Sequence, residues 1–326
     1  MDSAMDIEWP ADVPLHACPA TAQGVMHSSK KVAPPHRATK AMASRPPRAT
    51  KAMKTGQQLR AAVGAACASG GPVFLEIFSG SGRLTKAMSD RGIPSMGIDI
   101  NDGYDMLHAD VLGEVLALIR QGRALGVWLA TPCGGLGRAR RGKPWAARVE
   151  AGIFTGFPAA IRSDKHVWGL PDHELSPKDR VALANSNAGV HVSLKIIEAC
   201  RAAGVPVAME NPARSFLWIM PEVLSLMEQE DSYHMVCDLC AYGTPWKKAT
   251  ALLFHGWAGV SKLSKTCHAV KIGKGHRPLC GFSAVPHVTL SGIDKQKRSW
   301  KTTLAEPYPW PLVEEISGVF KAMCQG

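Results

Sequence analysis

The chain has 326 residues, of which 46% are hydrophobic, and its 38 Lys and Arg residues outnumber its 27 Asp and Glu residues to give a formal net charge of +11. This length suits one large α/β domain, no apolar run is long enough to span a bilayer, and the acidic N-terminus excludes a signal or transit peptide. The nine cysteines are irregularly spaced, so we expect an intracellular protein of the nucleus or cytoplasm, with a polyanionic partner rather than a membrane.

The first 70 residues predict a disordered basic tail. No acidic residue occurs between Asp12 and Glu76, and the proline-punctuated segment 34–42 recurs as 46–53. Such a stretch is typical of tails that hold phosphate backbones without reading the base sequence. The alternative is a solvated linker.

A strand, a glycine turn and a helix follow at the start of the predicted domain. Residues 73–78 predict the strand, 79–82 the turn, and the helix begins at Arg83. The glycines allow close approach of an adenosine-bearing ligand, and the missing Gly-x-Gly-x-x-Gly and phosphate-loop patterns favour one without phosphates. A second strand is predicted at 94–100 and contains Asp99. The spacing from the glycine turn to Asp99 is about that at which an acid binds the ribose hydroxyls. Asp110 precedes a predicted helix at 112–120. Loop or N-cap roles are the alternative for these acids and for Glu76.

A buried strand at 124–130 ends in Thr131, Pro132 and Cys133. Ligands of open α/β sheets bind at the carboxyl ends of strands, so a cysteine there is placed for chemistry; the alternative is a small core residue. A helix at 181–203 leads to another strand at 205–212, which carries Glu210 and Asn211. In a parallel sheet these two residues lie beside Cys133.

The remaining segments are basic or polar. The irregular stretch from Arg138 to about residue 178 includes Arg140 and Arg141, which suit contact with a phosphate backbone or a solvated loop. Residues 215–230 predict a helix, and 233–254 predict a hairpin whose turn carries Lys247 and Lys248. A polar insert at about 256–303 precedes an amphipathic closing helix at 311–323.

From residue 72 to the closing helix, the sequence resembles the cytosine-C5 DNA methyltransferase family. The turn resembles its first motif, which holds S-adenosylmethionine through Phe78, Ser79, Gly80, Ser81 and Gly82. The resemblance implies further cofactor contacts at Asp99, Ile100, Asp110, Val111 and Thr131. It implies that Cys133 is the nucleophile that adds to C6 of a flipped cytosine, with Pro132 shaping the strand exit. It also implies that Glu210 engages N3 of the base and that Asn211 holds the loop.

The resemblance implies a class I, Rossmann-like methyltransferase fold over residues 71–326, with a mixed, mostly parallel sheet and a small C-terminal insert. It also implies a monomer that binds DNA, with RNA left open, through Arg138, Arg140, Arg141, Lys247 and Lys248. The sequence departs from the family at Pro212, Gly134 and Gly135, in the Trp246-Lys247-Lys248 stretch, and in the short insert. The closest likeness is a divergent Glu-Asn-Pro branch of the kind carried by phages and mobile elements.

Other functions remain open. A catalytically inactive, nucleic-acid-binding relative is favoured by the altered basic stretch and disfavoured by the intact Cys133 and Glu210. An amino-methyltransferase that acts on adenine or on cytosine N4 is disfavoured, because Thr-Pro-Cys stands where such an enzyme would be expected to carry a Pro-Pro-Tyr/Phe motif.

A rival interpretation of the cysteines is a zinc site in the insert, built from Cys237, Cys240, Cys267 and Cys280, with His268 and His276 nearby. The Cys-x-x-Cys spacing fits zinc, but strand alternation would spread these side chains. Unrelated core and surface cysteines are the favoured alternative, so no metal is predicted.

Overall fold

A six-stranded sheet organises the computed structural model, which describes residues 52–67, 69–138, 145–150, 158–271, 277–290, 293–294 and 299–325. The strand order is β2-β1-β3-β4-β6-β5. The strands are β1 (Val73–Ile77), β2 (Ser95–Ile98), β3 (Ala124–Leu129), β4 (Val207–Pro212), β5 (Ser232–Asp238) and β6 (Ala249–His255). β1 to β4 run parallel, whereas β6 is antiparallel to both β4 and β5. This is the mixed, mostly parallel α/β sheet of a Rossmann-like fold, as the sequence predicts.

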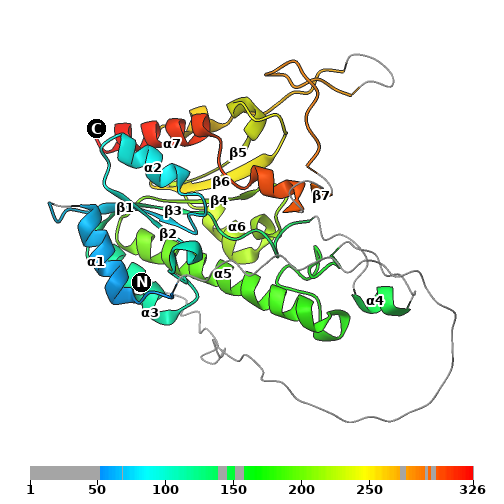
Figure 1. Cartoon of the computed structure of the whole chain (residues 1–326), viewed down its shortest axis with the longest axis horizontal. Helices are drawn as coiled ribbons and strands as arrows, with labels where there is room; N and C mark the ends of the chain where they lie inside the picture. The colour runs from blue at the N-terminus through cyan, green and yellow to red at the C-terminus, as the bar shows by residue number, and fades with distance from the viewer. Residues whose placement is uncertain are drawn as a thin grey trace, which may run out of the picture. The chain divides into compact units, whose positions relative to one another are not determined.

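Helices cover both faces of the sheet (Figure 1). Val73, Leu75 and Ile77 of β1 are buried in one core with residues of α1 (Gly56–Ala66), α3 (Ala109–Arg120) and α5 (Pro177–Ala202). Phe74 alternates to the other core with α2 (Arg83–Asp90) and α7 (Trp310–Met323). Burial on both faces explains why the parallel strands read as continuous apolar runs.

The smaller elements differ in part from the sequence prediction. The helix expected at 215–230 is broken into a 3-10 helix (Phe216–Ile219) and α6 (Pro221–Met227), because Pro221 starts a new helix at its first turn. The expected hairpin is confirmed as β5 and β6. The other elements are α4 (Trp145–Glu150), a 3-10 helix (Asp172–Glu174), and the strands β7 (Ile293–Asp294) and β8 (Ser299–Trp300) of the insert. None of the described helices is both long and apolar enough to cross a bilayer.

Helix α1 corrects the domain boundary predicted at residue 70. It lies within the segment assigned to the tail, yet it belongs to the same compact unit as the sheet. Leu59 and Val63, four residues apart on one helix face, are fully buried against the first core. Arg60 makes two hydrogen bonds, of 2.8 and 2.7 Å, to the Glu114 carboxylate of α3. The predicted tail up to residue 51 lies outside the described residues.

Candidate active site

The glycine turn joins β1 to α2 and is held by Asp99, the acid that follows β2. Gly80 and Gly82 have φ angles of 54° and 65°, in the left-handed region that favours glycine. Asp99 Oδ2 accepts a 2.9 Å hydrogen bond from the Gly80 amide, and its Oδ1 accepts bonds from the backbone and side chain of Asn101. The carboxylate therefore fixes the turn, and because it has about four lone-pair sites, it keeps acceptor capacity for a ligand.

The other two strand-end acids serve the fold. Glu76 is fully buried, and its Oε2 accepts hydrogen bonds of 2.7 Å from the Thr85 amide and 2.5 Å from the Thr85 hydroxyl. These bonds cap α2, whose N-cap Gly82 has no side chain to do so. Burial raises the pKa of Glu76 to about 7, against the lowering effect of the Thr85 bonds. Asp110 instead accepts a 2.6 Å hydrogen bond from Gly56 at the start of α1.

The predicted cofactor contacts fall into two groups. Ile100 is 60% exposed and directly follows Asp99, so an apolar side chain open to solvent lies next to the acid and the turn. This combination fits an adenosine, whose ring would cover the side chain and whose hydroxyls would meet the carboxylate. In contrast, Val111 is fully buried in the first core. The Thr131 hydroxyl lies 2.8 Å from that of Ser193 and therefore faces α5.

Cys133 lies four residues beyond the end of β3, at the carboxyl edge of the sheet, and is exposed. Its carbonyl accepts hydrogen bonds from the Leu136 and Gly137 amides, which folds the following residues into a tight turn. A Cβ atom at Gly135 would lie 2.4 Å from Ser186 Cβ of α5. The turn thus sits against α5 at a distance that only glycine allows, and this contact holds the thiol on the molecular surface.

Arg162, which sequence reasoning missed, fastens this turn to α5. It is 3% exposed and donates to the Gly135 carbonyl at 2.9 Å, the Ser186 hydroxyl at 3.0 Å and the Asn187 side-chain oxygen at 2.6 Å. Burial lowers its pKa to about 10. These acceptors are all neutral, so the guanidinium acts by its fixed fork of donors rather than by an ion pair.

Glu210 lies on β4, the strand next to that of Cys133, just beyond the part of β4 that pairs with β3. Leu129 of β3 pairs with Met209 of β4, so Glu210 comes one residue later at the same edge. The carboxyl group is 7% exposed; its Oε2 accepts a 3.1 Å hydrogen bond from the Tyr308 hydroxyl, and its Oε1 is buried without a partner. A buried carboxyl oxygen without a partner is costly, which marks Oε1 as the atom available to a bound group.

Lys248 links Glu210 and Cys133 electrostatically. Burial raises the pKa of Glu210, and Lys248 opposes this effect. Desolvation by the surrounding protein also raises the pKa of the Cys133 thiol; Lys248 lowers it and Glu210 raises it. The sequence assigned Lys248 to nucleic-acid contact, but the structure brings its charge within reach of both candidate catalytic groups. Its ammonium group donates a 3.0 Å hydrogen bond to the Ala305 carbonyl.

Asn211 ties the two strand ends together. Its side-chain amide donates a 2.7 Å hydrogen bond to the Thr131 carbonyl, and its Oδ1 is buried without a partner. A second tie follows, because the Phe216 amide donates to the Leu136 carbonyl at 2.9 Å. The segments after Cys133 and after Glu210 therefore form one connected edge.

The predicted basic contacts are only partly described. Arg138 forms an ion pair with Asp164, and its guanidinium lies 4.5 Å from the centre of the Phe216 ring. Lys247 pairs with Asp238 at 3.2 Å but stays 41% exposed. Arg140 and Arg141 lie outside the described residues. Nucleic-acid contact by these residues stays a prediction.

Tyr308 is the second functional residue that sequence reasoning missed. It lies just before α7, 7% exposed, donates to Glu210 and accepts a 3.2 Å hydrogen bond from the Trp128 indole. Burial first, and the Glu210 charge second, raise its pKa well above the usual value, so it remains a donor. The only local signal is a tyrosine between two prolines.

Comparisons with known proteins give little more. No model of a protein family matches the sequence, and no curated protein matches it. Among solved structures, the methyltransferase EhMeth of Entamoeba histolytica is similar over 56% of this chain and 52% of its own, with 12% identity and a TM-score of 0.31. The chain thus spans about half the length of that structure, and a likeness of this strength assigns no function.

Proposed function

We propose that the chain is an S-adenosylmethionine-dependent methyltransferase that modifies C5 of cytosine in DNA through a covalent Cys133 adduct. One observation carries the proposal. An exposed thiol follows β3, while a buried carboxyl group lies on the neighbouring β4, one residue beyond the pairing of the two strands, and that carboxyl group has one oxygen without a partner.

Cys133 supplies the nucleophile. C5 of cytosine is a weak nucleophile, and addition of a thiolate to C6 converts the ring into an enamine that reacts at C5. Burial raises the pKa of this thiol, and the positive charge of Lys248 offsets part of that rise, so formation of the thiolate relies on Lys248. After methylation, loss of the C5 proton to a base re-forms the C5–C6 double bond and expels the thiolate.

Glu210 supplies the proton donor at N3 of the base. Burial raises its pKa, and a carboxyl group with a raised pKa holds a proton closer to neutral pH, where it can donate. Tyr308 occupies Oε2, so Oε1 is left to face the base. Protonation or hydrogen bonding at N3 offsets the negative charge that develops on the ring as the thiolate adds.

The residues around the glycine turn fit the cofactor. Gly80 and Asp99 form the binding edge, and the exposed Ile100 offers an apolar surface for an adenine ring. When bound, the cofactor supplies a methyl group on a sulfonium. The cytosine must leave the duplex to reach Cys133, and the basic charge of the chain suits a DNA backbone.

Trapping with 5-fluorocytosine tests the covalent step. Fluorine at C5 blocks the proton loss that releases the enzyme, so wild-type protein with S-adenosylmethionine should form a complex with 5-fluorocytosine DNA that survives denaturing electrophoresis. Cys133→Ser should form none, and Glu210→Gln, which keeps size but has no acidic proton, should form it more slowly.

Cys324→Ser is the matched control, because Cys324 is also exposed but lies after α7. It should trap like wild type. Methylation that persists in Cys133→Ser would refute the covalent mechanism. Cofactor and DNA binding with neither methylation nor trapping on DNA or RNA would support the inactive relative instead.

A further inference from the structure

We propose that Cys240, Cys267, Cys280 and His287 form a structural zinc site that fastens the C-terminal insert to the hairpin beside the candidate active site. Cys240 lies in the 3-10 helix Leu239–Tyr242 that follows β5. Cys267 comes after β6, and Cys280 and His287 belong to the described insert segment 277–290. The three cysteines are buried together as a separate cluster.

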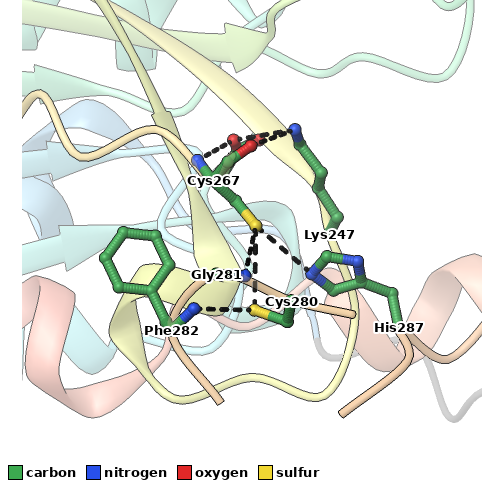
Figure 2. Close-up of polar contacts among 7 residues, drawn as sticks. Lys247, Cys267, Cys280, Gly281, Phe282 and His287 are labelled. Carbon is green, nitrogen blue, oxygen red and sulfur yellow. Dashed lines mark hydrogen bonds and ion pairs between the residues drawn. The ribbon is translucent and has the colours of Figure 1, made fainter. Parts of the chain in front are cut away.

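The distances match a tetrahedral centre. One ligand atom from each of the four residues lies within 4.8 Å of the others. Cys267 Sγ is 3.7 Å from Cys280 Sγ and 3.7 Å from His287 Nε2, as Figure 2 shows. Zinc bonds of about 2.3 Å to sulfur and about 2.0 Å to nitrogen, at tetrahedral angles, place two sulfurs about 3.8 Å apart and sulfur and nitrogen about 3.5 Å apart.

A disulfide explains the cluster less well. The separation of 3.7 Å between Cys267 Sγ and Cys280 Sγ is far longer than a disulfide bond of about 2.05 Å, and three cysteines leave one unpaired. The surroundings favour thiolates instead. The Gly281 amide donates to Cys267 Sγ at 3.4 Å, and the Phe282 amide donates to Cys280 Sγ at 3.4 Å (Figure 2). Such outer contacts orient metal-bound sulfur and offset its negative charge.

Beyond Leu263, the described parts of the insert have almost no apolar core and therefore need a stabilising centre. Within 264–271 and 277–290, Cys267 and Cys280 are the only buried residues, whereas Phe282, Val285 and Val288 are about half exposed. Segments that bury so little apolar surface are usually held by disulfides or metals. A bound ion would join four points of the chain in one centre.

The site also sets the position of the basic turn between β5 and β6. Asp238 accepts a 2.7 Å hydrogen bond from the Cys267 amide and pairs with Lys247 at 3.2 Å, while Lys247 donates to the Cys267 carbonyl at 2.9 Å. The Val288 amide donates to the Pro245 carbonyl at 2.7 Å. Three thiolates, one imidazole and Zn²⁺ carry a net charge of −1, and Lys247 faces that charge.

The fourth ligand is His287, not the Cys237 suggested by the Cys-x-x-Cys spacing. Strand alternation turns the Cys237 side chain into the second core, as the sequence analysis anticipated for a cysteine within a strand. Cys240 escapes this alternation because it lies beyond the strand in the 3-10 helix. His268 is not part of the cluster, and His276 lies outside the described residues.

The test is metal content of the full chain, purified under reducing conditions without chelator. Inductively coupled plasma mass spectrometry should find about one zinc per chain, and Co²⁺ exchanged into the site should show the visible and thiolate charge-transfer bands of a tetrahedral sulfur-rich centre. Cys267→Ser, Cys280→Ser and His287→Ala should each lose most of the zinc. Cys237→Ala and Cys324→Ser should keep it.

A second arm covers variants that fail to fold. Wild-type protein treated with a mercurial thiol reagent and a zinc indicator should release about one zinc, and proteolysis within the insert should accelerate as the metal leaves. Sub-stoichiometric zinc that Zn²⁺ reconstitution does not restore, or a Co²⁺ spectrum without tetrahedral bands, would overturn the proposal. Zinc retained in Cys267→Ser and lost in Cys237→Ala would also overturn it.

Discussion

Replacing Tyr308 with phenylalanine removes one hydroxyl that serves two buried groups. The hydroxyl donates to Glu210 Oε2 at 3.1 Å and accepts from the Trp128 indole at 3.2 Å, and Trp128 is fully buried. The ring stays, so the packing against Trp128 in the second core is kept. The variant therefore isolates the two hydrogen bonds from the apolar contacts.

Both losses destabilise the folded state. A buried indole left without an acceptor costs about 1–3 kcal/mol, and a hydrogen bond to a charged group is worth about 1.5–3 kcal/mol against about 0.5–1.5 kcal/mol for a neutral one. Burial already raises the pKa of Glu210 and the Tyr308 bond lowers it, so Tyr308→Phe should raise this pKa further. The loss of stability should be larger above the folded-state pKa of Glu210, where the carboxylate is charged, than below it.

Urea unfolding of wild type and Tyr308→Phe across pH measures this loss. The free energy of unfolding should fall by about 2 kcal/mol or more at high pH, and by less at low pH. A double-mutant cycle with Glu210→Gln should show a coupling of about 0.5–3 kcal/mol. Tyr233→Phe is the control, since that tyrosine is 43% exposed. A Tyr308→Phe loss below about 0.5 kcal/mol, or one independent of pH and of Glu210, would refute the reasoning.

Four further predictions concern Asp99 beside the glycine turn, the buried Glu76, Arg162 beside the turn that follows Cys133, and the segment 1–51. Asp99→Ala should weaken S-adenosylmethionine binding about ten-fold or more in calorimetry, because it removes a charged acceptor from the turn; unchanged affinity would exclude this site. Since burial raises the Glu76 pKa to about 7 from 4.5, the folded state holds that proton more tightly, and stability should fall as pH rises from about 4.5 to about 7. Glu76→Gln should remove this part of the slope, and an unchanged slope would contradict the assignment. Arg162→Lys should reduce stability by about 2–4 kcal/mol and slow adduct formation, because an ammonium cannot reproduce the fork of donors; wild-type trapping rates would argue against a positioning role. Deleting residues 1–51 should flatten the dependence of DNA affinity on salt concentration without changing sequence preference, whereas an identical log–log slope would make the segment a linker.

The placement of Cys133 and Glu210 could be predicted because it follows from the order of strands and helices along the sequence. Each lies at the end of an apolar run, a helix separates the runs, and parallel strands joined by a helix place their carboxyl ends at one edge. The pairing of Leu129 with Met209 confirms this juxtaposition. The same logic located Asp99 beside the turn at Gly80.

The residues that complete the site could not be found in this way, because they come from far along the chain. Tyr308 is 98 positions from Glu210, and Arg162 comes from a loop that shows no hydrophobic periodicity. Lys248 was recognised as basic, but its effect on Cys133 depends on how the β5–β6 hairpin returns along β4. Such contacts are set by tertiary packing.

Helix α1 was missed for a different reason, since its signal is local. Thr55 and Gln58 form a capping box, in which each side chain bonds the other residue's amide, and Leu59 and Val63 follow at helical spacing. These four residues lie inside an acid-free basic stretch. The composition of the first 70 residues indicates a tail, and it was given more weight than the helix pattern of these four. A helix whose Arg60 pairs with Glu114 and whose first amide binds Asp110 also occupies the acid that the family resemblance assigns to the adenine. Asp110, one of the residues that the resemblance assigns to the cofactor, is thus already bonded to the first amide of α1, which makes this helix part of the domain rather than of the tail.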